Sequence, residues 1–252
     1  MPLPFDVNRL IDTEVNFSKR FTNVTPKPYG LVYWNEANKD SHDSNHAIIT
    51  DFVGVESSLK DIETFFKAKG IQPWLYPSFK EKELERLGPA LQNHNFVINN
   101  HPHQFYLHNK DSLIEAQSNI HIERIRQMTP ELQEYITENQ EGESTIKVVQ
   151  RHLSHPNYHL LGAYVNGALV AVASVNIFAG YSRVDDVHTH KFYRGKGYSS
   201  TLIHYIIQYH KRLSDNHLYL YSAIPEAIKV YSKAGFEPIA QNLKFWTAHK
   251  AQ

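Results

Sequence analysis

The sequence predicts an α/β fold with α+β character, in which helices and strands mix along the chain. Three observations support this prediction. A strand-like run leads through a glycine-containing loop into a helical run, Asn166-Gly167 joins two apolar runs as a hairpin, and amphipathic helical patterns alternate with strand-like runs in both halves. We expect a smaller α/β domain over residues 1–109 and a second domain over residues 119–252.

The composition narrows the class of protein. The 252 residues are 41% hydrophobic, include no cysteine and carry no net charge, which argues against a general nucleic-acid or membrane surface. No apolar run approaches the roughly 18 residues of a transmembrane helix, and residues 1–6 lack the features of a signal peptide. We therefore expect a cytoplasmic protein without disulfides, thiolate metal sites or a cysteine nucleophile.

Strand and helix patterns alternate in the N-terminal half. The helical segments carry leucine, isoleucine and phenylalanine at helical spacing, and Gly70 ends the first of them. The predicted elements are a strand at 46–52, a helix at 58–69, a strand at 71–79, a helix at 82–94 and a strand from 95.

The second half gives a longer series of elements. Thr129-Pro130-Glu131 is a helix start, with a cap, a first-turn proline and an acidic residue. The predicted order is a strand at 120–126, helices from 130 and at 144–153, the hairpin 158–165 with 168–178, a strand at 182–189, a helix at 201–212, a strand at 217–222, a short helix around Tyr231 and strand material at 236–248.

The loop after the strand at 182–190 carries the most specific motif, Arg194-x-x-Gly197-x-Ser199. Helix N-termini bind anions because their first N–H groups lack intrahelical partners and lie at the positive end of the helix dipole. Glycine lets the backbone approach a ligand closely. The loop is neither a Walker A loop nor a dinucleotide fingerprint, so it predicts another phosphate-binding construction.

A second motif follows about thirty residues later, Ala227-x-x-x-Tyr231-x-x-x-Gly235-Phe236. Ala227 and Tyr231 fall on one face at helical spacing, and Gly235 suits the left-handed residue that ends a helix. Each motif alone is weak, but the two in this order and context form a strong joint signal.

Together these motifs resemble the two hallmarks of the GNAT superfamily of acyl-CoA-dependent N-acetyltransferases. The order of elements also resembles the GNAT fold over about residues 119–250. This resemblance implies a mixed, mostly antiparallel central sheet flanked by helices. The N-terminal half is similar to a degenerate GNAT-like copy, with Leu91 at the Tyr231 position and Asn95 at the Gly235 position; the alternative is an unrelated α/β extension.

The resemblance also implies site roles. Acetyl-CoA would be the acyl donor, and Tyr231 would protonate the departing thiolate. The family often has an asparagine seven residues before this tyrosine, where this chain has Ile224, so that contact is in doubt. The residues expected to contact the cofactor are Val187, His188, Thr189, Arg194, Gly195, Lys196, Gly197, Tyr198, Ser199 and Ser200.

Direct attack on the thioester requires a neutral amine, and hence a base. Asp185 and Asp186 on the predicted strand are candidates, and His188 is a third because its reference pKa lies near neutrality. Neighbouring side chains on a strand face opposite ways, so at most one aspartate should face the cleft. The sequence does not separate the three from one another or from a merely solvated carboxylate.

We expect this chain, as a monomer or homodimer, to transfer an acetyl group from acetyl-CoA to a primary amine of a small molecule or peptide. The alternative is a non-catalytic CoA-binding or regulatory module. Aminoacyl-tRNA-dependent peptide addition is disfavoured by the neutral charge and the CoA-type loop. The 16 histidines show no recognised ligand spacing, so we expect no metal.

Overall fold

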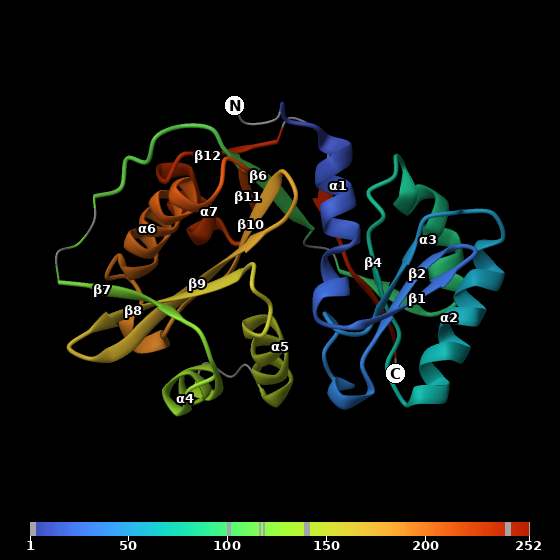
Figure 1. The fold of residues 1–252 in the computed structure, drawn as a ribbon. Coiled ribbons are helices and arrows are strands. Elements are labelled where there is room, and N and C mark those ends of the chain that lie inside the picture. The colour runs from blue at the N-terminus through green and yellow to red at the C-terminus, as the bar shows by residue number, and fades with distance from the viewer. Residues whose placement is uncertain are drawn as a thin grey trace. The chain divides into compact units, whose positions relative to one another are not determined.

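The computed structural model describes residues 4–99, 102–115, 117, 119–138, 142–239 and 243–251, and the chain divides into two compact units (Figure 1). The C-terminal unit comprises Met1–Asp6 and Gln104–Asn242, and the N-terminal unit comprises Val7–His103 and Leu243–Gln252. Each unit has its own sheet and its own hydrophobic core.

The C-terminal unit confirms the order of elements predicted from the sequence and adds one strand, β6. Its strands are β6 (His103–His108), β7 (His121–Ile125), β8 (Tyr158–Val165), β9 (Ala168–Ile177), β10 (Tyr181–Thr189), β11 (His217–Ser222) and β12 (Phe236–Pro238). Its helices are α4 (Pro130–Glu138), α5 (Glu143–Leu153), α6 (Tyr198–Leu213) and α7 (Pro225–Lys233), and the 3-10 turn η3 (Lys191–Tyr193) precedes α6.

The strands of this unit lie in the order β12-β6-β11-β10-β9-β8-β7. The β10–β11 pair is parallel, while the other pairs along this order are antiparallel. The sheet is therefore mixed and mostly antiparallel, as the fold class predicts.

The two faces of the sheet are covered by different helices (Figure 1). On β9, Ala171 and Ala173 belong to the core formed with α6 and α7, whereas Val172 belongs to the core formed with α4 and α5. This alternation follows from the two-residue period of a strand. The small alanines let α6 approach the sheet, and the other face holds the larger side chains beneath α4 and α5.

The turn between β8 and β9 has the geometry that its sequence predicts. Asn166 and Gly167 both have positive φ angles, 51° and 82°. A two-residue hairpin turn with both central residues at positive φ matches the right-handed twist of its strands. The Asn-Gly dipeptide thus sets the register of the hairpin that supports β10.

The N-terminal unit is also a sheet with helices. Its strands are β1 (Asn23–Lys27), β2 (Gly30–Trp34), β3 (His46–Ile49), β4 (Trp74–Tyr76), β5 (Phe96–Ile98) and β14 (Ala248–Lys250), in the order β1-β2-β3-β4-β14-β5. Its helices are α1 (Val7–Val15), α2 (Val55–Lys69) and α3 (Glu83–Asn93), with 3-10 turns η1 (Phe17–Arg20) and η2 (Glu36–Asn38). No helix in the described part of the chain has the length and apolarity needed to cross a bilayer.

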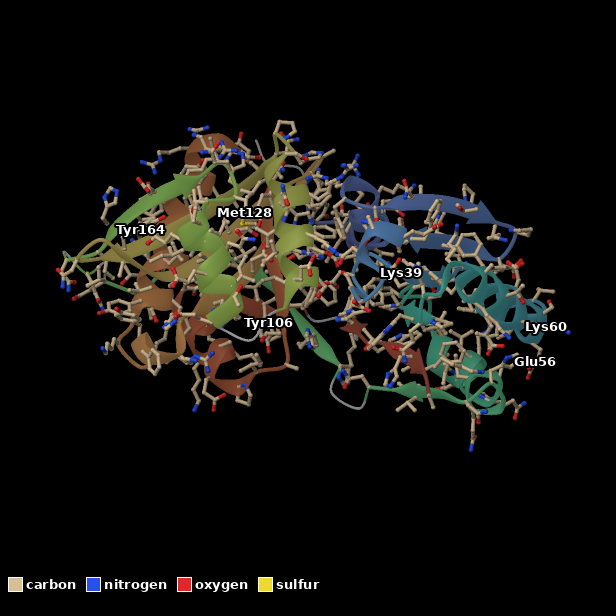
Figure 2. The ribbon with its side chains drawn as sticks, turned by 90° about the horizontal axis from the view of Figure 1, so that it is seen from below. Lys39, Glu56, Lys60, Tyr106, Met128 and Tyr164 are labelled. Carbon is tan, nitrogen blue, oxygen red and sulfur yellow. The ribbon has the colours of Figure 1, made fainter. Side chains whose placement is uncertain are left out.

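Helix α2 shows the amphipathic pattern that predicted it. Leu59, Ile62 and Phe66 are fully buried in the core of the N-terminal unit. Glu56 and Lys60 lie on the outer face of the helix (Figure 2). Burial of one apolar stripe, rather than helix propensity alone, holds such a helix in place.

Part of the N-terminal unit repeats the topology of the C-terminal unit. The series β3-α2-β4-α3-β5 corresponds to β10-α6-β11-α7-β12, and β3 is parallel to β4 as β10 is to β11. Asn95 has a φ of 55°, and Gly235 has a φ of 93° at the matching place before the last strand. The left-handed conformation predicted at Asn95 is therefore present, which supports the interpretation of the N-terminal half as a degenerate copy.

Each sheet includes one strand from the range predicted for the other domain. Strand β6 follows the N-terminal half but pairs with β11 and β12, and β14 ends the chain but pairs with β4 and β5. The units consequently depart from the contiguous ranges 1–109 and 119–252. The strand material expected at 236–248 is divided into β12, β13 (Lys244–Phe245) and β14, and residues 240–242 lie outside the described residues.

A buried carboxylate fixes the C-terminal segment within the N-terminal unit. Glu83 accepts hydrogen bonds from the backbone and hydroxyl of Ser78, at 2.9 and 2.7 Å, and from the Trp246 indole at 2.7 Å. Burial raises the pKa of this carboxyl group, and the three donors counteract that effect. The segment that carries β14 is therefore held by polar contacts as well as by the strand ladder.

We predict that Ala248→Asp unfolds the N-terminal unit first. Ala248 is fully buried and pairs with Leu75 and Ile98, so the substitution places an unpaired charge between two strands. Hydrogen exchange should show protection lost in β3, β4 and β5. The matched control is Ala251→Asp, because Ala251 is exposed three residues later. Loss of protection confined to β10–β12 would contradict the assignment of β14.

Candidate active site

Two parallel strands separate at the centre of the C-terminal unit. The β10–β11 ladder joins Tyr181–Arg183 to His217–Tyr219, whereas β10 continues to Thr189 and β11 to Ser222. Beyond Arg183, the edge of β10 that faces β11 has no ladder partner, while its other edge remains paired with β9. Val187, His188 and Thr189 lie on this free stretch, where backbone groups are available to an extended ligand.

The glycine loop ends at the start of α6. Gly197 is the N-cap residue with a φ of 82°, and it makes no side-chain cap, so the helix starts at Tyr198, three residues earlier than predicted. The first intrahelical bond runs from Thr201 N–H to Gly197 O at 3.0 Å. The N–H groups of residues 198–200 find no acceptor among the described residues. Ser199 and Ser200 are therefore first-turn residues rather than caps, beside a ready anion site.

Arg194 and Lys196 hold the loop in different ways. The Arg194 guanidinium donates to Thr189 O at 3.1 Å and to His188 Nε2 at 3.3 Å, which ties the loop back to β10. The Lys196 ammonium lies 5.2 Å from the Tyr193 ring centre and remains exposed. Gln117 donates to Lys196 O at 2.9 Å. Lys196 is thus the freer cation, and Arg194 is largely used to shape the loop.

Tyr198 and Gly195 differ from the rest of the loop. The Tyr198 side chain is buried in the core against α6 and the sheet, so it anchors the helix start and can offer only its backbone to a ligand. Gly195 has a φ of 76°, and a β-carbon there would meet nothing within 4 Å. Its glycine requirement is therefore conformational rather than steric.

Tyr231 lies on α7 beneath this region. It is 7% exposed and packs against Phe236, with ring centres 6.2 Å apart. Burial raises the pKa of its phenol to about 12, and the charge of Asp185 adds to this effect. Its hydroxyl makes no hydrogen bond to the described residues, so the group is a protonated, uncommitted donor.

Ile224, seven residues before Tyr231, is the N-cap residue of α7 and is 60% exposed. Its backbone N–H donates to the Ser222 hydroxyl at 3.1 Å, but its side chain cannot hydrogen-bond a ligand. At this position the chain departs from the family pattern and offers no side-chain hydrogen-bonding group.

The two aspartates of β10 have different environments. The strand bulges between Asp185 and His188, and Asp186 has a φ of 51°. Asp185 forms an ion pair with Arg183. Asp186 instead accepts hydrogen bonds from Tyr158 Oη at 2.8 Å and Ser174 Oγ at 2.6 Å. The bulge thus gives Asp186 its own orientation, which simple strand alternation does not predict.

Asp186 also borders a cavity of about 140 Å³. The walls are mostly apolar and come from α4, α5 and the facing strands. They include Leu132, Tyr135, Ile136, Thr145, Val149, Leu160, Val172, Val187 and His188. Both hydrogen bonds to Asp186 end on Oδ2, so Oδ1 has no protein partner among the described residues. One carboxylate oxygen therefore remains for a ligand.

Burial raises the pKa of Asp186 to about 7, and the nearby charge of Asp185 adds to the effect, while Ser174 and Tyr158 oppose it. A carboxyl group that titrates near neutrality can both accept and release a proton at working pH. No sequence pattern singled out its two partners. Ser174 offered the only hint, as a hydroxyl within the otherwise apolar run of residues 169–175.

His188 is held as a neutral ring. The Tyr135 hydroxyl lies 3.0 Å from Nδ1 and donates to the His188 carbonyl at 3.1 Å, while Arg194 approaches Nε2. Because a guanidinium group only donates, Nε2 accepts and the proton is assigned to Nδ1. Burial lowers the pKa of His188 to about 4, and the charges of Arg194 and His190 lower it further. His188 therefore joins α4, β10 and the loop.

The central part of the chain matches a known family. Residues 123–236 match the model of the Acetyltransferase (GNAT) family. This chain contains a GNAT domain. The matched range begins within β7, includes the loop and Tyr231, and ends at the first residue of β12. No curated protein matches the chain.

Solved structures share the fold of the GNAT domain and of the whole chain. A GCN5-related N-acetyltransferase from Kribbella flavida is 16% identical, with a TM-score of 0.73 over 99% of this chain and 97% of that one. A conserved protein of unknown function from Staphylococcus epidermidis is also 16% identical, with a TM-score of 0.63 over 91% of this chain and 94% of that one. A tandem GNAT protein from the clavulanic acid biosynthesis pathway is 15% identical, with a TM-score of 0.55 over 82% of this chain and 76% of that one. At such low sequence identity, the structural similarity establishes the fold alone.

The GNAT domain brings most predicted site residues to one region of β10 and the start of α6. Asp185 faces Arg183 instead of the cavity, and Tyr198 faces the core. In the described part of the chain, no three histidine or acidic side chains are grouped so that they could hold a metal ion.

We predict that Asp186→Asn stabilises the protein at alkaline pH. The pKa of this acid is higher in the folded protein than in the unfolded chain. The ionised carboxylate therefore destabilises the fold increasingly as pH rises from the unfolded pKa to the folded pKa of about 7. At pH 8 the variant should have a higher Tm than the wild type, by roughly 2–4 °C for each kcal/mol of added stability. The difference should narrow at pH 5. A difference that stays constant with pH would contradict the raised pKa.

Proposed function

We propose that the GNAT domain transfers an acetyl group from acetyl-CoA to a primary amine by direct attack on the thioester. The observation that carries this proposal is the buried carboxyl group of Asp186, with one free oxygen at a cavity, on the same strand that leaves its ladder partner beside the glycine loop. A base, an open strand edge and an anion site thus occur on consecutive segments of one chain.

The uncapped start of α6 suits the pyrophosphate of acetyl-CoA. The N–H groups of residues 198–200 would receive phosphate oxygens, with Lys196 adding a charge and Ser199 or Ser200 a hydroxyl. The free edge of Val187–Thr189 would hydrogen-bond the amide-containing arm. Arg194 supports the loop from behind through its bonds to β10.

The chemical step requires two proton movements. The neutral amine nitrogen bonds to the thioester carbonyl carbon, the carbon–sulfur bond breaks, and the electron pair leaves on sulfur. Asp186 accepts the proton that the amine loses, and Tyr231 donates a proton to the thiolate. Asp186 is favoured over the other candidates because Asp185 is paired with Arg183 and the ring of His188 is engaged on both nitrogens.

The acceptor that the cavity favours is an amine on a compact apolar group. The lining offers aliphatic and aromatic side chains, with Asp186 as the acidic group at one side. A cavity of about 150 Å³ with such walls accommodates a benzene ring. A phenyl or branched alkyl group would therefore fill the cavity and leave its amine near Asp186.

We predict that acetyl-CoA raises the Tm of the wild-type protein and that Gly197→Ala removes the shift. At 100 times its dissociation constant, a ligand stabilises by about 2.7 kcal/mol. A β-carbon at Gly197 strains a left-handed residue and would lie 2.6 Å from Gln117 Nε2, so it displaces the side chain that bonds the loop at Lys196 O. The matched control is Gly167→Ala, a hairpin glycine with the same φ of 82°. If both variants lose the acetyl-CoA shift equally, the result would argue against the loop as the binding site.

We predict that the wild-type enzyme acetylates 2-phenylethylamine faster than spermidine. Asp186→Asn should lower kcat/KM by about 10²–10⁴ and remove the inflection near pH 7, because it removes the base. Tyr231→Phe should lower kcat while acetyl-CoA binding is retained. Tyr164→Phe is the control, since burial raises the pKa of that phenol to about 12 as well.

The exposed Ile224 favours one alternative, a CoA-binding module without turnover, because it removes a polar contact near Tyr231. An acetyl-CoA shift without acetylation of any amine would support that module. Acetylation of spermidine alone would retain the enzyme but reject the apolar acceptor.

A further inference from the structure

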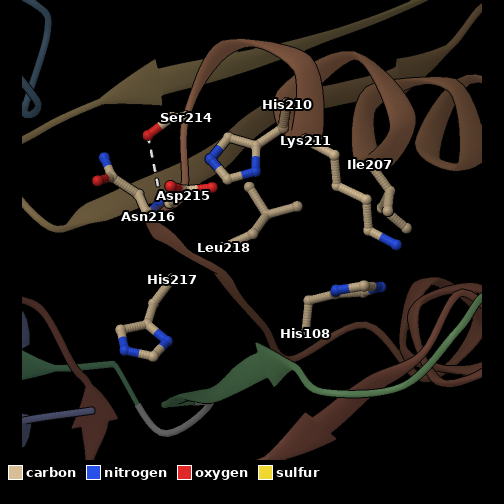
Figure 3. Close-up of a pocket in the computed structure, with 9 residues that line it drawn as sticks. All are labelled: His108, Ile207, His210, Lys211, Ser214, Asp215, Asn216, His217 and Leu218. Atoms are coloured by element: carbon tan, nitrogen blue, oxygen red, sulfur yellow. Dashed lines mark hydrogen bonds between the residues drawn. The ribbon is translucent and has the colours of Figure 1, made fainter. Parts of the chain in front are cut away.

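A second cavity, of about 250 Å³, lies at the far end of α6 from the glycine loop (Figure 3). It is bordered by the last turn of α6, the start of β11 and the end of β6. Helix α6 has 16 residues, which corresponds to about 24 Å of helix. The two sites therefore share a helix but not their residues.

Two histidine rings in this cavity have unused nitrogens. His210 is 3% exposed, and its Nε2 atom is buried with no hydrogen-bond partner in the described part of the chain. The Nε2 atom of His108 is also buried without a partner of hydrogen-bond geometry there, and it lies beside Gly235 and the Ala234 carbonyl. A buried polar atom without a partner costs free energy, so two beside one cavity indicate that a ligand satisfies them.

A cation faces the same space. Figure 3 shows the Lys211 side chain extending towards His108. Lys211 is about half exposed, and its nearest acid is Asp111, 3.6 Å away and almost fully exposed. Such a surface ion pair contributes little to the stability of the fold, so the ammonium group can exchange Asp111 for another partner. The Ser214 hydroxyl, also at the cavity, offers a further possible donor.

Lys211 is the positive charge beside the rings, and it acts against Asp215 and the negative C-terminal end of the α6 dipole. Burial lowers the pKa of His210 to about 4, and His108 lowers it further. Burial also lowers the pKa of His108, and Lys211 adds to that effect, while Asp111 and the Ala234 carbonyl oppose it. The remaining titratable groups at the cavity are Asp215 and His217.

A metal ion fits less well. No group of three potential ligands was found among the described residues, and an ammonium group beside His108 opposes a second cation. The His217 ring contacts the Tyr181 ring at a tilt of 38°, with ring centres 5.5 Å apart, and is thus oriented by the core. Donors and one fixed positive charge, rather than a ligand cage, characterise this cavity.

We propose that this cavity binds a small oxyanion, a carboxylate or phosphate group, through His108, His210 and Lys211. The anion would accept a hydrogen bond from each ring and from the ammonium group, and binding would bring a proton to the histidine pair. The affinity should rise as pH falls, by about tenfold per pH unit for each proton taken up.

The test uses the whole chain and needs no acetyl-CoA. Sulfate, inorganic phosphate and acetate are titrated separately at constant ionic strength, and the histidine ring signals are followed by NMR. The signals of His108 and His210 should move together and saturate, with a dissociation constant for sulfate about tenfold lower at pH 6 than at pH 7. Tighter binding of phosphate than acetate, or the reverse, identifies the preferred group.

Lys211→Met should weaken binding at least tenfold, and its partly exposed position keeps the fold intact. Arg212→Met is the matched control, because Arg212 lies one residue later on α6 and outside the cavity lining. Equal weakening in both variants would reduce the effect to general charge and overturn the proposal. Movement confined to His188 and His190, or no saturation with any probe, would overturn it as well.

Discussion

The separation of β10 from β11 is the constraint on which the candidate active site depends. Three residue pairs join the strands, and β10 then continues with one edge unpaired. In most sheets such an edge would cost backbone hydrogen bonds, so its persistence requires support from elsewhere. β9 holds the other edge, and Arg194 and Tyr135 bind the strand end through the His188 backbone, its ring and Thr189. Because these contacts hold β10 in place, its unpaired edge stays accessible to a ligand.

The bulge in β10 makes the second contribution. Without it, Asp185 and Asp186 would point to opposite faces in regular alternation. With it, Asp186 reaches Tyr158 and Ser174 from a left-handed residue, which is uncommon outside glycine, asparagine and aspartate. The same burial that raises the pKa of this acid also destabilises the ionised fold. The proposed function and the stability of the fold therefore make opposite demands on this carboxyl group.

The segment that carries β14 links the folding of the N-terminal unit to residues far along the chain. β14 completes the N-terminal sheet only after the last residues are present, and Glu83 and Trp246 stabilise that arrangement. β6 lies between β11 and β12 in the C-terminal sheet and begins the contiguous part of that unit. The N-terminal unit has kept the topology of its counterpart, but Leu91 stands at the place of Tyr231.

The sequence by itself determined the local elements and the two motifs. Asn166-Gly167, Gly197, Asn95 and the apolar stripe of α6 each act over a few residues, so short-range rules predict them. The sequence also indicated three candidates for a base, all on one predicted strand. It did not predict α1, β1, β2 or β6, whose periodic signals are short or weak.

Only the tertiary structure decided which residues meet. Tyr158, Ser174 and Asp186 lie on three strands, and His108 and His210 lie 102 positions apart on a strand and a helix. The placement of β14 between β4 and β5 likewise depends on pairing between residues at least 150 positions apart. Such contacts arise from the burial of whole faces and the satisfaction of buried polar atoms, and neither leaves a periodic trace in the local sequence.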